Sequence, residues 1–391
     1  MPRIQQSRKV VIEEKLRSAF ATLGVDTDSS LAEPLDRSKI SLAKVLDRSN
    51  VPAMPQVANR VTLMDIAQDA NVSRATVSLV LRNVPVVAEQ TRQRVLDSMS
   101  RLGYVYHRGA ASLRTQRTRS VGLVVTDIAN PFFAEIIVTI EEHLERAGYV
   151  TLLGNTSETP AKQQRLVQTM EEYPVDGLLL CSSSDGSHEL AEQIRRCRAP
   201  KVLVVRSLPN VPSDYAGVDN ASGAEIAVTH LVNLGHSRIA FLGGPAGISS
   251  RDERVAGYQT ALRERGLQVL DSPGSKPTRE GGYQLMRELL NQPDPPTAAL
   301  CFNDVVAIGA MEMLTDAGKK PGKDFSIVGF NNVSEATVCR PTLTTIDTMP
   351  RQIGANAAEL LLRRIQEPDA PFLTRLVRPR LVQRESSGYL N

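Results

Sequence analysis

One short stretch of the chain carries side chains suited to binding anions and nucleobase edges. Residues 74–82 have helical spacing, and Val77, Val80 and Leu81 form their apolar face. Ser73 precedes them as a suitable N-cap, because its hydroxyl can accept a hydrogen bond from a free amide of the first turn. The opposite face of this helix carries Arg74, Ala75, Ser78, Leu79 and Arg82. Arginine and serine on an exposed helix face can donate to phosphate oxygens and to base edges.

Two further helices are needed to position that face. Residues 63–70 repeat apolar side chains at spacings of three and four, and Asn71 follows, which tolerates the left-handed backbone that ends a helix. Residues 89–102 form a third helical pattern with its own apolar face. Two short helices joined by a tight turn and supported by a third predict a helix-turn-helix, whose second helix has the diameter to enter a B-DNA major groove.

The segment that follows these helices is basic. Residues 101–119 contain five arginines, at positions 101, 108, 114, 117 and 119, and no carboxylate. Such a run gives salt-dependent affinity for any duplex. Arginine-rich segments are also common as solvated linkers, and a three-helix bundle can bind protein instead. The turn, the cap and the basic flank together favour DNA binding.

The same stretch resembles the signature of a known family. VTLMDIAQDANVSRATVSLVLRN, residues 61–83, is similar to the N-terminal signature of the LacI/GalR family of bacterial transcriptional regulators. Further matching segments are LGY (102–104), NPFF (130–133), LGHSRIAFLGG (234–244), RVAGY (254–258), FND (302–304) and PTLTTI (341–346). The resemblance covers the chain from about residue 60 to the C-terminus.

The resemblance implies roles for residues of the predicted helix-turn-helix. Base-reading positions fall on Arg74, Ala75 and Leu79, although many members carry a polar or basic residue where this chain has leucine. An apolar contact with a thymine methyl is the alternative for Leu79. Phosphate-contacting positions fall on Thr62, Ser73, Thr76, Ser78 and Thr91.

Residues 107–118 resemble the family's hinge helix and linker. The implied DNA-contacting residues are Arg108, Ala110, Leu113 and Arg114. Leu113 matches the leucine that wedges into a minor-groove step and kinks the duplex, whereas composition alone favours an ordinary core leucine. Gly109 disfavours an isolated helix by about 1 kcal/mol relative to alanine, so we expect the hinge to order only on DNA.

The composition argues against a metal-stabilised, disulfide-stabilised or membrane-spanning protein. The chain has 391 residues, enough for two or three domains, and a mild net charge of +3. Its four cysteines, at positions 181, 197, 301 and 339, include no C-x-x-C pair, so we expect neither a zinc site nor a disulfide framework, and a reducing cytoplasm fits. The sequence has no apolar run of about eighteen residues and no signal-peptide core, so we expect no membrane span.

Residues 1–59 lie outside the family pattern. They mix aspartate, serine, proline and charge without a period, apart from an amphipathic helical pattern over 10–23. We therefore expect a flexible N-terminal extension. Met54 begins a segment that resembles an ordinary family start, which leaves open whether residues 1–53 are translated.

Residues 119–391 alternate between apolar runs and helical patterns. The predicted strands are 121–125, 150–153, 177–180, 202–205, 239–242, 298–302 and 326–330. The predicted helices are 134–147, 161–172, 189–197, 221–234, 251–265, 281–291 and 305–317. Such alternation is typical of parallel sheets covered by helices on both faces, so we expect an α/β protein with two doubly wound lobes.

The resemblance implies that these are lobes of periplasmic-binding-protein type with three crossings between them. Lobe 1 comprises about 119–218 and 348–370, and lobe 2 about 219–347 and 371–391, with crossings near Asp219, 344–347 and Pro371. A dimer interface along both lobes is also implied. Ligands of doubly wound sheets bind beyond the carboxyl ends of the strands, which places the ligand between the lobes.

Candidate ligand-binding side chains lie where predicted strands end. Phe132 and Phe133 could stack on a sugar or base ring, although core packing at a helix start explains one of them equally well. Arg254 matches the family arginine that pairs with effector hydroxyls or a carboxylate, and a surface arginine is the alternative. Asn303 and Asp304 end another strand, where Asp304 could be only an N-cap.

Three further residues complete the predicted effector site. Asn331 ends a strand where many sugar-sensing members have aspartate, and its amide both donates and accepts whereas a carboxylate only accepts. Asp185 and Ser250 are weaker candidates. No cofactor or metal is expected, because the five histidines at 107, 143, 188, 230 and 236 lack metal-ligand spacing.

Two rival functions share the predicted two-lobed fold. An enzyme is disfavoured because no G-x-G-x-x-G, P-loop or G-x-S-x-G motif is present, and the glycine-rich loop 243–247 lacks the P-loop lysine. A periplasmic solute-binding protein is disfavoured by the basic head and the absent signal peptide. We therefore expect a cytoplasmic, homodimeric repressor that binds a pseudo-palindromic operator and responds to a sugar or sugar derivative between its lobes.

Overall fold

The chain folds into two compact units that divide at residues 106 and 107, and each is described by itself. The computed structural model describes residues 61–82, 84–105, 117–183, 188–208 and 211–390. The predicted N-terminal extension over 1–59 and hinge residues 107–116 lie outside the described residues.

The first unit is a bundle of three helices. They are α2 (Leu63–Asp69), α3 (Arg74–Leu81) and α4 (Glu89–Leu102), which lie as predicted. Ile66, Val77 and Val95 contribute one fully buried side chain from each helix to the bundle core. The small core therefore fixes α3 against two supporting helices.

Local signals in the sequence set the ends of these helices. Thr62 and Asp65 form a reciprocal capping box at the start of α2. Asn71 adopts the left-handed conformation, with φ of 48°, in the turn that leads to α3. Ser73 caps α3 by accepting a hydrogen bond from the Thr76 amide at 3.1 Å, as its residue type predicts.

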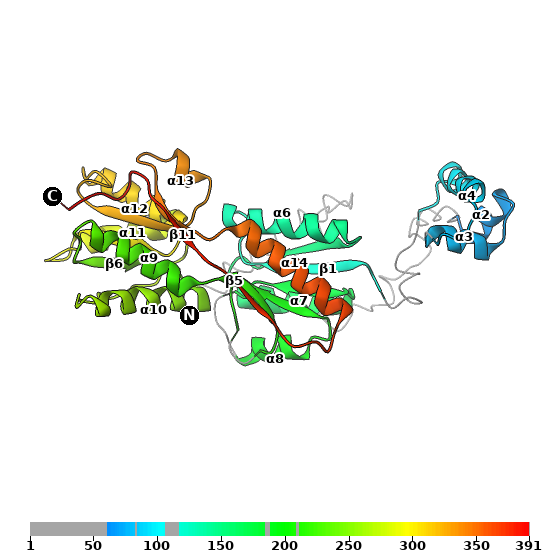
Figure 1. Ribbon diagram of the computed structural model, residues 1–391, viewed down its shortest axis with the longest axis horizontal. Helices are drawn as coiled ribbons and strands as arrows, with labels where there is room; N and C mark the ends of the chain where they lie inside the picture. Colours follow the sequence, from blue (N-terminus) through cyan, green and yellow to red (C-terminus); the bar gives the residue numbers. More distant parts are fainter. Residues whose placement is uncertain (1–60, 83, 106–116, 184–187, 209–210, 391) are drawn as a thin grey trace, which may run out of the picture. The chain divides into compact units, whose positions relative to one another are not determined.

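The second unit contains a six-stranded sheet, lobe 1, in the order β10-β5-β4-β3-β1-β2 with every pairing parallel. In Figure 1 its helices α6 and α14 lie side by side. Its strands are β1 (Ser120–Val125), β2 (Val150–Asn155), β3 (Gly177–Leu180), β4 (Lys201–Val204), β5 (Asp214–Val218) and β10 (Thr374–Val377). Its helices are α6 (Pro131–Arg146), α7 (Pro160–Glu172), α8 (His188–Arg196) and α14 (Pro350–Gln366). α6 and α14 share one hydrophobic core with the sheet, and α7 and α8 share another.

Lobe 2 is a five-stranded sheet in the order β11-β9-β8-β7-β6, in which β11 runs antiparallel to β9. Its strands are β6 (Ile239–Leu242), β7 (Ala298–Cys301), β8 (Ser326–Asn331), β9 (Thr344–Asp347) and β11 (Arg380–Val382). Its helices are α9 (Asn220–Asn233), α10 (Ser249–Glu264), α11 (Arg279–Leu290), α12 (Asp304–Asp316) and the short α13 (Glu335–Val338). α9 and α10 cover one face of the sheet, and α11 and α12 cover the other.

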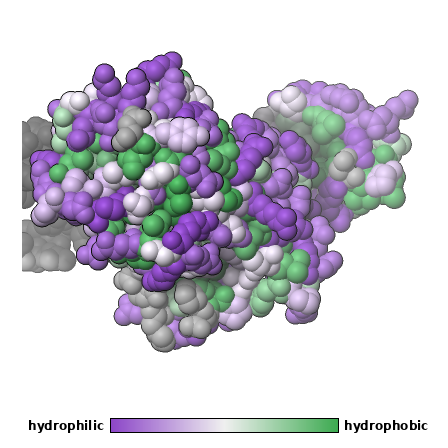
Figure 2. Space-filling model, turned by 60° about the vertical axis from the view of Figure 1, so that its left-hand side comes forward, coloured by the Kyte–Doolittle hydropathy of each residue, from purple (hydrophilic) through white to green (hydrophobic). Residues whose placement is uncertain are grey.

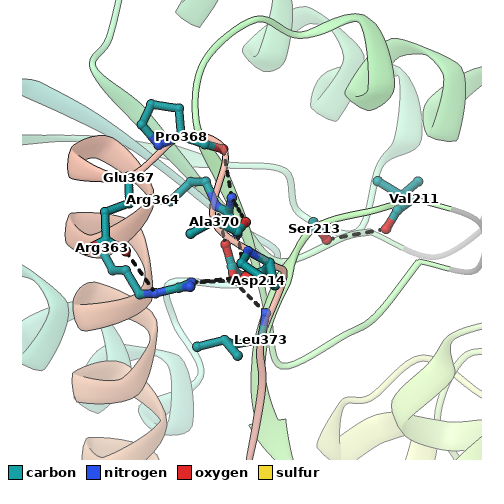
Figure 3. A network of polar contacts seen from close by, with 10 residues as sticks. Val211, Ser213, Asp214, Arg363, Arg364, Glu367, Pro368, Ala370 and Leu373 are labelled. Atoms are coloured by element: carbon teal, nitrogen blue, oxygen red, sulfur yellow. Dashed lines mark hydrogen bonds and ion pairs between the residues drawn. The ribbon is translucent and has the colours of Figure 1, made fainter.

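The structure corrects the third predicted crossing between the lobes. β10 pairs with β5 in the lobe 1 sheet, so the chain crosses after Val377 and not near Pro371. The reason is the buried carboxylate of Asp214, which accepts hydrogen bonds from Arg364 Nε at 2.7 Å and from the Leu373 amide at 2.8 Å (Figure 3). These bonds hold the segment between α14 and β10 against the start of β5.

The surface carries no broad apolar face in the view of Figure 2, where hydrophobic side chains are scattered among hydrophilic ones. Among the described residues, no helix is both long and apolar enough to cross a bilayer.

Candidate DNA-reading helix and effector cleft

The exposed side of α3 carries the residues predicted to read DNA. Arg74 and Ala75 are exposed, and Ser78 and Leu79 are half-buried. The Ser73 hydroxyl also bonds the Thr76 hydroxyl at 2.9 Å, which fixes both side chains at the start of the helix. Because helix N-terminal amides and hydroxyls favour anions, this end of α3 is suited to a phosphate.

Two predicted phosphate contacts lie at the starts of the neighbouring helices. The Thr62 hydroxyl donates to the Asp65 carboxylate at 2.8 Å, so its role in the structure is to cap α2. The hydrogen bonds from the Thr62 amide and hydroxyl hold the pKa of Asp65 below its usual value. Thr91 is half-buried in the first turn of α4. The predicted hinge residues Arg108, Ala110, Leu113 and Arg114 lie outside the described residues, as does Asp185.

A cleft between the two lobes gathers most of the predicted effector residues. Phe132 and Phe133 contribute from lobe 1, and Ser250, Arg254, Asn303 and Asn331 contribute from lobe 2. The cleft is also lined by residues that were not predicted from the sequence, namely Asp127, Asn130, Glu158, Val205, Arg206, Pro277 and Phe302. We call this space the aromatic compartment.

Both phenylalanines line the compartment and belong to the core of lobe 1. Phe132 and Phe133 are 3% and 5% exposed, and their ring centroids lie 5.2 Å apart in an edge-to-face arrangement. The Asn130 side chain caps α6 by accepting a hydrogen bond from the Phe132 amide at 3.1 Å. The binding and packing interpretations of these rings are therefore compatible.

Arg254 is buried in the cleft and is not a surface arginine. Its guanidinium lies 4.9 Å from the Phe302 ring centroid and 3.8 Å from that of Phe330. Nε donates to Asn220 Oδ1 at 2.8 Å, and Nη1 donates to the Phe302 carbonyl at 2.5 Å. Burial, followed by the nearby charge of Arg206, lowers the pKa of Arg254 to about 9, so the group is charged at neutral pH but poorly solvated.

A second buried arginine faces the cleft from lobe 1. Arg206 makes two hydrogen bonds to the Glu158 carboxylate, at 2.7 and 2.9 Å, and a third to the Ser182 carbonyl at 2.9 Å. Val205 and Glu158 both adopt positive φ, of 67° and 55°, which is strained for these residue types. Arg206 directly follows an apolar strand pattern, and nothing in the neighbouring sequence indicates that it lines the cleft.

The structure corrects the interpretations of Asp304. Asn303 is the N-cap of α12, accepting a hydrogen bond from the Val306 amide at 2.9 Å, and Asp304 is the first residue of the helix. Asp304 does not line the cleft, since its fully buried carboxylate accepts bonds from the Thr345 hydroxyl and the Val333 amide. Its carboxylate holds α12 against β9 and against the segment that follows β8.

Asn331 presents an unsatisfied polar atom to the aromatic compartment. Its side chain is 5% exposed, and its Oδ1 has no hydrogen-bond partner among the described residues. The backbone at Asn331 has φ of 113°. An orphaned buried acceptor costs free energy unless a ligand or water donates to it, so Asn331 is poised to accept from a bound molecule.

Comparison with known proteins identifies the family. The model described as "Bacterial regulatory proteins, lacI family" matches residues 62–106, and that described as "Periplasmic binding protein-like domain" matches residues 228–387. The HTH-type transcriptional repressor PurR of Mannheimia succiniciproducens is 35% identical over 331 residues, which cover 83% of this chain and 98% of the relative. The chain belongs to the LacI family of bacterial regulatory proteins.

Solved structures of transcriptional regulators share the architecture. A lac repressor dimer bound to operator and the anti-inducer ONPF is 27% identical, with a TM-score of 0.77, and the match covers 84% of this chain and 99% of that one. A complex of the transcriptional regulator CelR with cellobiose is 29% identical, with a TM-score of 0.64. That match covers 84% of this chain and 100% of the CelR chain. This LacI-family chain is accordingly a DNA-binding transcriptional repressor with two lobes of periplasmic-binding-protein type, and it is not an enzyme.

Proposed function

We propose that this repressor binds a pseudo-palindromic operator as a homodimer and that a sugar or sugar derivative between the lobes controls the binding. The observation that carries the effector part is the aromatic compartment, where aromatic rings and hydrogen-bonding groups of both polarities converge from the two lobes. Such a mixture is typical of sites for small polar ligands.

The chemistry of the compartment suits hydroxyl groups. Arg254 donates, the carboxylates of Asp127 and Glu158 accept, and the amide of Asn331 can do both. The phenylalanine rings offer faces for the apolar side of a sugar ring. The CelR structure is a complex with cellobiose, and it supports a sugar as the class of ligand.

The DNA part of the proposal rests on α3 and on the hinge. Arg74, Ala75 and Leu79 would read base edges in the major groove of each half-site. Leu113 would wedge into the central minor groove, within a hinge over 107–118 that connects a head over 60–106 to the lobes. The lac repressor structure is a dimer bound to operator, and it supports operator binding by two copies of the chain.

The dimer part is supported by apolar residues at one edge of lobe 1. β2 is an edge strand, and its Val150, Leu152 and Leu153 are 52%, 38% and 48% exposed. Val138 on α6 is 49% exposed. Exposed apolar side chains on an unpaired strand edge favour burial against a second copy of the chain.

Control of DNA binding requires that the ligand distinguishes two arrangements of the lobes. A ligand with equal affinity for both would shift neither, however tightly it bound. Because the compartment is built from both lobes, a ligand that bridges them favours the arrangement in which both sets of groups reach it.

The test is a thermal-shift screen of the full chain against sugars, sugar acids, polyols and nucleobases, since a ligand that binds only the native state raises the melting temperature. A sugar that raises it should also change the affinity for a palindromic operator measured by fluorescence anisotropy. A response to nucleobases alone would contradict the sugar assignment.

Arg254→Ala should remove the response of operator binding to that sugar, because the variant loses a buried donor in the aromatic compartment. Operator binding without sugar shows whether the variant is folded. Arg263→Ala, at an exposed position of the same helix, is the control and should respond like the parent protein. A normal response by Arg254→Ala would refute the cleft as the effector site.

A further inference from the structure

A second compartment of the cleft lies on the other side of Arg206. It is lined by Ser182, Ser183 and Ser207 from lobe 1 and by Ser249 and Asp252 from lobe 2. Arg206 lines both this space and the aromatic compartment, so its side chain forms the boundary between them. We call the second space the serine compartment.

Two buried polar atoms at the serine compartment lack a hydrogen-bond partner within the part of the chain that the structure describes. Ser183 is 2% exposed and Arg206 is 4% exposed, and neither Ser183 Oγ nor Arg206 Nε has a hydrogen-bond partner among the described residues. Buried polar atoms in folded proteins are almost always paired. These two atoms therefore point to a bound molecule that supplies the missing contacts.

The charges around the serine compartment favour a neutral ligand group. The guanidinium of Arg206 is already neutralised by two hydrogen bonds to Glu158. Asp252 adds an exposed carboxylate at the first turn of α10, where an anion would otherwise bind. Serine hydroxyls and a carboxylate accept from hydroxyl groups, and the serines can also donate to them.

The two lobes already meet at this compartment. The Ser207 amide donates to the Ser249 hydroxyl at 2.9 Å, and this bond joins lobe 1 to the start of α10. A ligand group that occupies the serine compartment therefore contacts both lobes at a second place, in addition to the contacts made in the aromatic compartment.

We propose that the effector is a disaccharide, with one sugar unit in the aromatic compartment and the second in the serine compartment. The glycosidic bond passes Arg206, whose free Nε donates to the ligand. This inference rests on the proposed function, because it takes the cleft as the effector site, and it narrows the ligand from sugars in general to two-unit sugars.

The experiment measures binding of the full chain by isothermal titration calorimetry to glucose, galactose and fructose and to cellobiose, maltose, trehalose, lactose, melibiose and sucrose. At least one disaccharide should bind about tenfold or more tightly than either of its component sugars, which corresponds to about 1.4 kcal/mol. A monosaccharide that binds as tightly as every disaccharide containing it would overturn the inference and leave the proposed sugar response standing. Binding by none of these sugars would overturn the disaccharide inference, and a thermal-shift screen in which no sugar, sugar acid or polyol binds would overturn the proposed function as well.

Ser183→Ala separates a ligand contact from a structural role. Removing an unpaired buried hydroxyl should leave the melting temperature unchanged or raise it, while the affinity for the disaccharide falls about fivefold or more. Ser272→Ala is the matched control, since Ser272 Oγ is also buried without a partner among the described residues but lines neither compartment. Equal disaccharide affinity in the Ser183→Ala and Ser272→Ala variants would refute the role of Ser183. A further variant, Ser207→Leu, should weaken disaccharide binding because the larger side chain fills the serine compartment.

Discussion

At the scale of single residues, the side chains buried near the cleft divide into those that face a ligand and those that hold the lobe together. Arg254 and Asn331 keep groups available in the aromatic compartment, whereas Asp304 directs both carboxylate oxygens at protein donors. Sequence position alone does not separate these roles, because Asn331 ends β8 and Asp304 begins α12, so both lie where a strand ends or a helix begins. The difference depends on which donors the fold brings within reach.

Asp304 should make the stability of lobe 2 depend on pH. Burial raises its pKa to about 6, above an unfolded value near 3.9, so between these values the folded state binds more protons than the unfolded state. Stability contributed by the protonated form is therefore present below about pH 4 and is lost as the pH rises through about 6.

The matched comparison is Asp304→Asn, which cannot titrate. Urea unfolding of both proteins at several pH values from 4 to 7 should show the parent losing stability relative to the variant as pH rises, by at most about 1.4 kcal/mol per pH unit. Parallel stability curves would mean that Asp304 has an ordinary pKa in the folded state.

At the scale of helices and strands, caps fix where the DNA-reading helix begins. Ser73 bonds the Thr76 amide and hydroxyl, and α3 has only eight residues, so its first turn is a large share of the helix. A short isolated helix is marginal in water, and therefore the cap and the packing of Val77 and Val80 decide whether α3 holds its position.

Ser73→Ala should destabilise α3 by about 1 kcal/mol and weaken operator binding. Hydrogen exchange of the α3 amides, compared with operator affinity, checks both effects. Thr278→Ala removes an equivalent cap from α11 in lobe 2, where Thr278 accepts a hydrogen bond from the Gly281 amide at 3.1 Å. That control should speed exchange in α11 without changing operator affinity, and a similar loss of DNA binding would argue against a local role for Ser73.

The sequence predicts the elements with continuous apolar patterns and misses those that depend on distant partners. The strands that correspond to β1 to β4 and β6 to β8 were all predicted, because parallel strands buried on both faces have apolar runs. β5, β9 and β10 were not. β5 begins with a buried aspartate, β9 is the short polar run Thr344–Asp347, and only one of the four β10 side chains is buried. Asp214 is tolerated there because Arg364, 150 residues later, pairs with it.

In the effector site, too, residues in local motifs were predicted from the sequence and residues that depend on distant partners were not. Phe132, Arg254 and Asn331 were predicted from motifs, while Arg206 and Glu158 were not. The latter pair is joined by a bidentate ion pair between residues 48 positions apart, and no local spacing indicates such a contact. Strained backbone at Val205 turns Arg206 toward the cleft at the end of an otherwise ordinary buried strand.

At the scale of the whole molecule, the proposed function needs a second copy of the chain, because a pseudo-palindrome presents two half-sites. The two edges of the lobe 1 sheet are β2 and β10, and both carry exposed apolar side chains. Val150 on β2 is 52% exposed and Leu376 on β10 is 50% exposed. These edges make a matched pair for testing which one forms the interface.

Val150→Lys should weaken the dimer about a hundredfold, equivalent to about 2.7 kcal/mol, because a lysine charge would be desolvated in the interface. Leu376→Lys should leave the dimer intact, since the change is of the same kind at the opposite edge of the same sheet. Sedimentation velocity over a range of protein concentrations measures both. Because two linked heads bind a palindrome far more tightly than one, Val150→Lys should also lower affinity for a full operator while affinity for a half-site stays the same. Dissociation caused by Leu376→Lys and not by Val150→Lys would move the interface to β10.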